Sequence, residues 1–150
     1  MRTCLLLFVT IAGLAQAPKG PASVPAPQPV ATTLQVMRGI MLPAADTIFN
    51  AGNQAPKDDQ GWAQVEYSAL TIAECANLIM IGNRVKDRGN WLKFAKNLRE
   101  AAIKTYQVAQ KKDADALLDA GGELTEACDA CHVPYRDQPR ERAEKAGKGK

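Results

Sequence analysis

The chain has 150 residues, a formal net charge of +3 and an aromatic content of only 5%. This length suits one domain with short flanking segments. The 19 Lys and Arg residues are scattered among 16 Asp and Glu residues, and aromatic side chains are too few to interleave with them, so nucleic acid is not an expected partner.

The first 17 residues are typical of a secretory signal peptide. Arg2 supplies the positive end, an apolar run follows from Leu5 to Leu14, and small residues at Ala15 and Ala17 suit cleavage. The apolar run is too short to span a bilayer, so no stable membrane insertion is expected. In a bacterial cell, such a signal predicts a periplasmic protein.

Two further segments differ in composition from a folded domain. Residues 18–31 contain five prolines among small side chains and predict a disordered linker. Residues 138–150 carry Arg, Lys and Glu with two glycines and predict a flexible basic tail. The expected folded domain is therefore residues 32–137.

Four segments of this domain have the three-and-four spacing of apolar residues that is typical of an amphipathic helix. They span about residues 33–50, 61–81, 90–110 and 113–137. Pro43 predicts a kink or a local break in the first helix, and Asn90 is the expected N-cap of the third. Short connections between four helices favour an all-α, antiparallel up-down-up-down bundle.

Each helix carries one apolar stripe that should face the core. The first stripe consists of Leu34, Met37, Met41, Ala44 and Ile48. The last consists of Leu117, Gly121, Leu124, Cys128, Cys131 and Tyr135. Gly121 in this stripe predicts the close approach of a neighbouring helix.

The last stripe contains the motif Cys128-Asp129-Ala130-Cys131-His132. C-x-x-C-H is the attachment site of a c-type haem, in which the two thiols bond to the porphyrin vinyl groups and the histidine ligates the iron. His132 is the only histidine in the chain, so a second histidine cannot fill the sixth position. The motif predicts one covalent haem c with His132 as an iron ligand.

Two other interpretations of C-x-x-C are a redox dithiol and half of a zinc site. A zinc site needs further cysteine or histidine ligands, and the remaining cysteines are Cys4 in the predicted signal peptide and Cys75 in an apolar run. A thioredoxin-like dithiol needs a βαβ context, and no strand pattern is visible. Both interpretations are therefore less favoured than haem attachment.

The up-down order brings the motif to the same end of the bundle as the start of the first helix, the end of the second and the start of the third. The pocket residues expected there, in addition to the motif, are Met37, Leu78, Ile79, Met80, Trp91 and Phe94, with Tyr135 at the border. Met37 is the first candidate for the sixth ligand, ahead of Met80 and Met41. Methionine also fills cores without binding metal, so the sequence leaves open that nothing fills this position.

Residues 128–136, Cys-Asp-Ala-Cys-His-Val-Pro-Tyr-Arg, at the end of a fourth helix resemble the cytochrome c′ family and its methionine-ligated, low-spin relatives. The resemblance extends over about Thr33–Arg136. It implies a four-helix bundle and His132 as proximal ligand, with Arg136 near the imidazole or the solvent edge. In the methionine-ligated members the matching position, Met37, is the sixth ligand, whereas in gas-binding members an apolar residue blocks that face. Members often form homodimers. One departure is that Thr33 and Leu34 stand where the family often has an Arg-Gln pair near the haem propionates.

These features predict a periplasmic electron carrier that serves redox partner proteins and is not an enzyme. Iron held by histidine and methionine is coordinatively saturated and changes charge with little rearrangement. The alternative is a haem protein that binds or senses nitric oxide or carbon monoxide at an open or displaceable sixth position.

Overall fold

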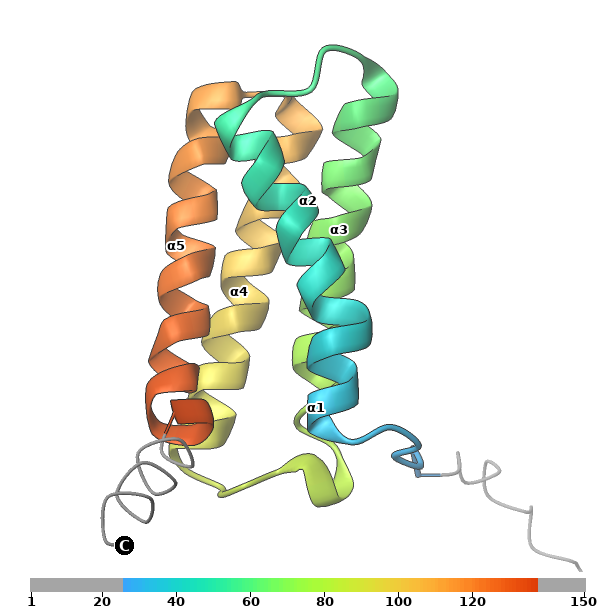
Figure 1. The fold of residues 1–150 in the computed structure, drawn as a ribbon, viewed down its shortest axis with the longest axis vertical. Coiled ribbons are helices and arrows are strands. Elements are labelled where there is room, and N and C mark those ends of the chain that lie inside the picture. The colour runs from blue at the N-terminus through green and yellow to red at the C-terminus, as the bar shows by residue number, and fades with distance from the viewer. Residues whose placement is uncertain (1–25, 138–150) are drawn as a thin grey trace, which may run out of the picture.

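The computed structural model describes residues 26–137, which form an all-helical fold (Figure 1). The predicted signal peptide, most of the linker and the predicted tail lie outside the described residues. Four long helical units run in alternating directions along the same axis (Figure 1). The prediction of an all-α domain with four helices is confirmed.

The first unit consists of α1 (Thr33–Val36), the π-helical segment η1 (Met37–Met41) and α2 (Leu42–Asn53). The second and third units are α3 (Asp59–Leu78) and α4 (Asn90–Lys111), joined by a loop that contains the short 3₁₀ turn η2 (Gly82–Arg84). The fourth unit is α5 (Ala114–His132), which continues into a second π-helical segment, η3 (Val133–Asp137).

Pro43 changes the hydrogen-bond pattern of the first unit without breaking it. Because proline has no N–H to donate, the regular pattern cannot run through this turn. The segment before it widens into η1, where the Leu42 N–H bonds to the carbonyl of Met37, five residues back. The helix then continues regularly through α2.

The wide turn also rotates the start of the first unit relative to the core. Val36 and Met41, five residues apart, are both buried, at 1% and 5% exposure. Leu34 is 57% exposed, so its prediction as a core residue is wrong. The extra residue in a π-turn shifts the inward face by one position, which a strict three-and-four spacing cannot anticipate.

Side-chain caps fix where the other helices begin. Asp58 accepts a hydrogen bond from the Gly61 N–H at 2.8 Å, and Asp113 accepts one from the Ala116 N–H at 3.0 Å. The expected capping role of Asn90 is wrong, because Gly89 is the N-cap of α4 and the side chain that bonds to the first amides is that of Asp87.

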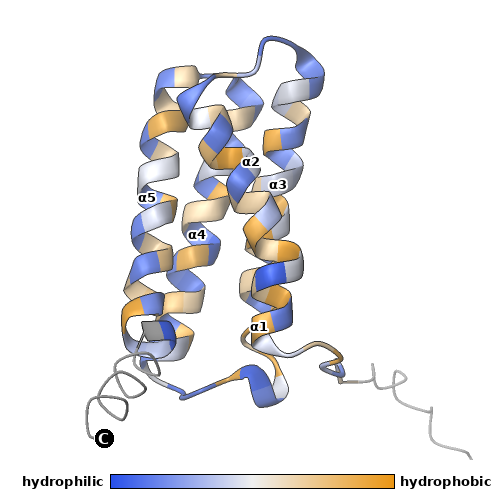
Figure 2. Cartoon of the chain, viewed as in Figure 1, coloured by the Kyte–Doolittle hydropathy of each residue, from blue (hydrophilic) through white to orange (hydrophobic). Residues whose placement is uncertain are grey.

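The core runs along the inside of the four units, and each helix turns polar residues outward (Figure 2). The fully buried large side chains include Ile48, Ile72, Ile79, Leu117 and Leu124. Gly121 is buried, but a methyl group added there would meet no atom within 4 Å. The predicted close approach at Gly121 is therefore wrong.

Candidate functional site

The motif occupies the last turn of α5. The three-and-four spacing that buries Leu117 and Leu124 carries on to Cys131, which is 7% exposed, whereas Cys128 is partly buried. Both cysteines are free thiols. The end of α5 therefore presents two unpaired thiols on its bundle-facing side.

The surroundings of these thiols disfavour their ionised form. Burial, followed by the negative charges of Asp129 and Cys131, raises the pKa of Cys128 to about 11. Burial also raises the pKa of Cys131. Both groups are therefore protonated thiols at neutral pH rather than activated thiolates of the kind that catalytic dithiols use.

Three predicted pocket residues meet beside the motif. The rings of Trp91 and Tyr135 are 4.9 Å apart at an interplanar angle of 86°, and those of Phe94 and Tyr135 are 6.4 Å apart at 74°. Such edge-to-face geometry is favourable for aromatic pairs. The Trp91 indole N–H also donates to the carbonyl of Ile79 at 2.8 Å. Trp91 and Phe94 at the start of α4 thus pack against Tyr135 of η3.

Asp87 is a member of this cluster that sequence analysis missed. One carboxylate oxygen accepts hydrogen bonds from the N–H groups of Gly89 at 2.8 Å and Trp91 at 3.1 Å. The other accepts the hydroxyl hydrogen of Tyr135. An aspartate just before a predicted helix start is the signal that would have indicated this role.

These bonds move two pKa values in opposite directions. The hydrogen bond from Tyr135, then that from the Trp91 N–H, lowers the pKa of Asp87. The same Asp87 carboxylate raises the pKa of Tyr135 to about 12. The ionised carboxylate of Asp87 and the neutral hydroxyl of Tyr135 thereby hold the loop before α4 to η3.

His132 is partly buried, and its Nδ1 lies 3.0 Å from Nη1 of Arg136, one turn later. A guanidinium group can only donate, so Nδ1 is the acceptor in this contact. This arrangement agrees with the expected position of Arg136 beside the imidazole. It also means that, in this geometry, a neutral ring carries its proton on Nε2.

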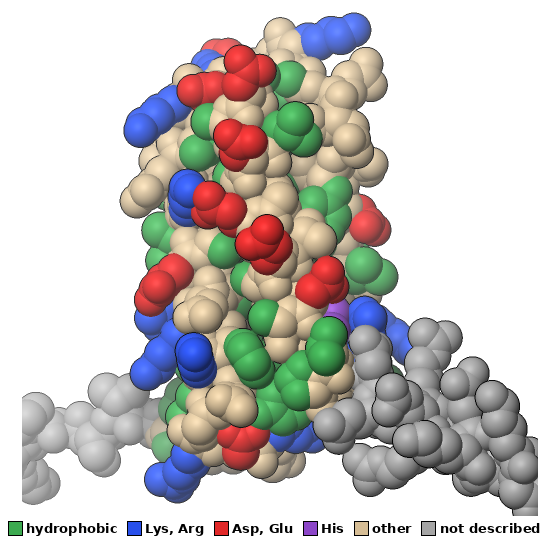
Figure 3. Space-filling view, turned by 90° about the vertical axis from the view of Figure 1, so that its left-hand side faces the viewer, with side chains coloured by type: hydrophobic (Ala, Val, Ile, Leu, Met, Phe, Trp, Pro, Cys, Tyr) green, Lys and Arg blue, Asp and Glu red, His purple; other side chains and the backbone are tan. Residues whose placement is uncertain are grey.

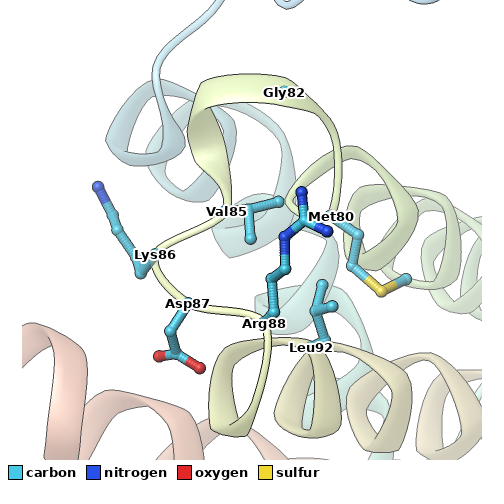
Figure 4. Close-up of a pocket in the computed structure, with 7 residues that line it drawn as sticks. All are labelled: Met80, Gly82, Val85, Lys86, Asp87, Arg88 and Leu92. Atoms are coloured by element: carbon cyan, nitrogen blue, oxygen red, sulfur yellow. The ribbon is translucent and has the colours of Figure 1, made fainter.

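The three candidate methionines differ in position. Met41 is buried in the core, whereas Met37 and Met80 are partly buried at its edge. The Met80 side chain lies beside Leu92, on the other side of the loop from Asp87 (Figure 4). Met37 opens η1, at the same end of the bundle as the motif (Figure 1).

The first unit and α5 diverge toward the end that carries the motif (Figure 1). α5 packs against α4 and α2, while η1 packs against α3, and neither α1 nor η1 has an extensive contact with α5. The side chains bordering this region are only partly buried and include Met37, Phe94, Ala127, Cys128 and Tyr135. α1 and η1 therefore contribute little of the contact that holds α5 in the bundle.

The chain matches no family model, no curated protein and no solved structure. Within residues 26–137, no three His, Cys, Asp or Glu side chains gather as a metal-binding group. None of the helices in that range is both long and apolar enough to span a bilayer.

Proposed function

We propose that this chain is an exported c-type haem protein that carries electrons between redox partners in the periplasm. The observation that carries the proposal is the C-x-x-C-H motif at the end of α5, with two unpaired thiols on the side of the helix that faces the bundle. The resemblance of residues 128–136 to the cytochrome c′ family supports the same assignment.

The residues present fit a covalently bound haem. Cys128 and Cys131 supply the two thiols for attachment, and His132 on the next residue supplies an imidazole for the iron. The partly buried rings of Phe94 and Tyr135 supply aromatic surface near the motif, and the buried ring of Trp91 packs against Tyr135. When bound, haem supplies a one-electron couple at its iron.

Arg136 and His132 have linked roles in this proposal. A histidine that ligates through Nε2 carries its remaining proton on Nδ1. Arg136 cannot donate to a nitrogen that bears a proton, so its present contact with Nδ1 has to rearrange when His132 becomes a ligand. Arg136 then serves as a charge beside the site rather than as a hydrogen-bond donor to the ring.

Met37 is the residue that we propose as the sixth ligand. It lies at the correct end of the bundle, partly buried, at the start of a π-helical segment. Such segments occur frequently at functional sites. Met41 is further along the same unit and packed in the core, and Met80 lines a hollow at the α3–α4 loop together with Leu92.

One observation favours the second candidate function, the binding of nitric oxide or carbon monoxide. The register change at η1 rotates the helix face, so Met37 is less deeply buried than Val36 and Met41 on either side of it. A ligand held at the edge of the core is more easily displaced than one packed inside it. A displaceable Met37 would make this a gas-responsive haem protein.

The visible spectrum of the haem-loaded, mature protein tests the ligand assignment. We expect Met37→Ala to abolish the sulfur-to-iron absorption of the ferric protein and to convert it to a high-spin form. Met41→Ala is the matched control on the same helical unit and should leave the spectrum nearly unchanged. A high-spin wild-type spectrum, or loss of the band only in Met80→Ala, contradicts the assignment.

Rapid mixing of the ferrous protein with carbon monoxide separates the two functions. For an electron carrier, carbon monoxide has to wait for Met37 to leave, so the rate should reach a plateau as its concentration rises. A rate that rises in proportion to concentration without a plateau indicates an open position and favours the gas-binding function.

A further inference from the structure

The loop between α3 and α4 borders an open hollow whose lining combines apolar and charged side chains (Figure 4). It has a volume of about 580 Å³ and is lined by Met80, Gly82, Val85, Lys86, Asp87, Arg88 and Leu92. Met80, Val85 and Leu92 are partly buried and form its apolar surface. Lys86 and Arg88 are exposed at its edge.

The single carboxylate of this hollow is ionised and exposed, but it is turned away from the apolar side chains. Asp87 points away from Met80 and Leu92 (Figure 4), and both of its oxygens accept hydrogen bonds from Gly89, Trp91 and Tyr135. An incoming group therefore meets apolar side chains and the guanidinium of Arg88, while Lys86 extends outward from the loop beside the hollow (Figure 4). An apolar site with a cationic edge favours an anionic partner with some apolar surface.

A second hollow with the same chemistry lies on the first helical unit. It has a volume of about 410 Å³ and is lined by Leu34, Gln35, Arg38 and Gly39. Leu34 and Arg38 are both exposed, and no carboxylate lines this hollow. Both hollows belong to the end of the bundle that carries the haem motif (Figure 1).

Hydrogen bonds from Arg84 fix the positions of the two hollows relative to each other. This arginine is only 6% exposed, and its guanidinium donates to the carbonyl of Ala31 at 2.8 Å and to that of Leu78 at 3.0 Å. Ala31 directly precedes the first helical unit. The ring of Pro29 also packs against Gly82. The surface is therefore pre-organised, which lowers the entropic cost of binding a partner.

The neighbouring surface has the opposite charge. α5 contains no Lys or Arg, and its acidic residues follow one another along exposed positions: Asp115, Asp119, Glu123, Glu126 and Asp129. Figure 3 shows Asp and Glu side chains following one another along this side of the molecule. An acidic partner is attracted to the loop and repelled from α5, so the charge pattern fixes its orientation.

From this arrangement we infer that the two cationic hollows, around Arg88 and Arg38, form the docking surface for an acidic protein partner in electron transfer. The inference rests on the proposed function, since it places the partner at the end of the bundle where the haem would be attached. The partner presents carboxylates next to an apolar side chain. The carboxylates meet Lys86, Arg88 and Arg38, and the apolar side chain enters a hollow.

Amide chemical-shift titration of the mature, full-length protein tests this surface. The probe is a short synthetic peptide of glutamates around a central leucine, at low salt. We expect shift changes concentrated in residues 84–93 and 34–39. The double variant Lys86→Glu, Arg88→Glu should weaken binding about tenfold, because each reversal removes one attraction and adds one repulsion. Both residues are exposed, so circular dichroism should show an intact fold.

The control variant Lys57→Glu, Lys111→Glu makes the same change of charge at the opposite end and should bind nearly as well as the wild type. Equal weakening by both variants would mean that only net charge matters and would overturn the inference. Sedimentation with phosphatidylglycerol vesicles, in the absence of any peptide-induced shift in the loop, would assign the surface to a membrane and also overturn it. The titration needs no haem chemistry, so a protein that lacks covalent haem but binds the peptide refutes the proposed function alone.

Discussion

The two ends of the bundle are built differently. The end that holds the loop from residue 54 to residue 58 and the turn at Lys112 has ordinary N-caps at Asp58 and Asp113 and an exposed ion pair of 2.7 Å between Lys112 and Asp59. The opposite end holds both π-helical segments, the aromatic cluster and a buried arginine.

The chain departs from the requirements of a simple bundle at only one of these two ends. Regular helices with side-chain caps are sufficient to connect and stop four units, and they are what the first end uses. π-Segments are rare and frequently occur at functional sites. Both π-segments lie at the end with the C-x-x-C-H motif, η1 just before Pro43 and η3 around Pro134 directly after His132. If this end depends on the contacts described for it, substitutions in those contacts should change stability more than matched control substitutions.

The largest effect on stability is expected for Arg84→Ala. Arg84 is buried and donates to two backbone carbonyls, and removing the donor leaves those carbonyls without this partner. We expect a loss of about 1.5–3 kcal/mol in the free energy of unfolding, the range for hydrogen bonds to charged groups. Urea unfolding measures it. Arg88→Ala, in the same loop but exposed, is the control and should change stability by less than about 0.5 kcal/mol. Equal effects of the two substitutions would contradict the anchoring role of Arg84.

Gly82→Ala should have the next largest effect. Gly82 has a positive φ of 59°, and a methyl group there would lie 2.6 Å from the Pro29 ring. Strain at such a position costs about 1–3 kcal/mol. Gly39→Ala tests the same substitution at a position where the added methyl group meets no atom within 4 Å and should be much less destabilising. A thermal melt that ranks the two variants in the reverse order would refute the steric argument.

Much of this architecture could be predicted from the sequence. The periodicity of apolar residues gave four helices within a few residues of their observed bounds, because burial of one face determines helix position strongly. It failed at Leu34, since a π-turn changes the period locally. It also missed Asp87 and Arg84, whose roles depend on hydrogen bonds between segments that are far apart in the chain.

The candidate site was partly predictable for the same reason. Trp91, Phe94 and Tyr135 were expected at one end from the direction of the helices alone, and the structure brings them together. The relative depth of Met37, Met41 and Met80 was not predictable, because it depends on the helix rotation at η1 and on the course of the loop after α3. Haem attachment and the sixth ligand remain predictions.

A smaller, stabilising effect is expected for Gly122→Ala. Gly122 is exposed in the middle of α5, and an added methyl group would meet no atom within 4 Å. Alanine is favoured over glycine in a helix interior by about 0.8–1.0 kcal/mol. A rise in the urea midpoint of that size checks it. A loss of stability would contradict this expectation, because it would show that α5 requires glycine at this position.

The smallest effect is expected for Tyr135→Phe, because the Tyr135–Asp87 bond is exposed. The pKa of Tyr135 is raised to about 12. The stability that its hydrogen bond contributes is therefore complete below the ordinary tyrosine pKa near 10 and disappears as the pH rises through about 12. The pKa of Asp87 is lowered. The stability that its ionised carboxylate contributes is therefore present above about pH 4 and disappears as the pH falls below that value. The stability difference between wild type and variant, followed by urea unfolding, should therefore shrink at both extremes. A difference that stays constant from pH 8 to pH 12 would contradict the hydrogen bond.

The intact mass of the mature, denatured protein tests the central claim most directly, after production in a host that attaches haem to exported proteins. The account predicts an increase by the mass of one haem, which is lost in the double variant Cys128→Ala, Cys131→Ala and kept in the control Cys75→Ala, whose thiol is buried in α3. An unmodified wild-type polypeptide, or a haem that separates from the chain on denaturation, would contradict it.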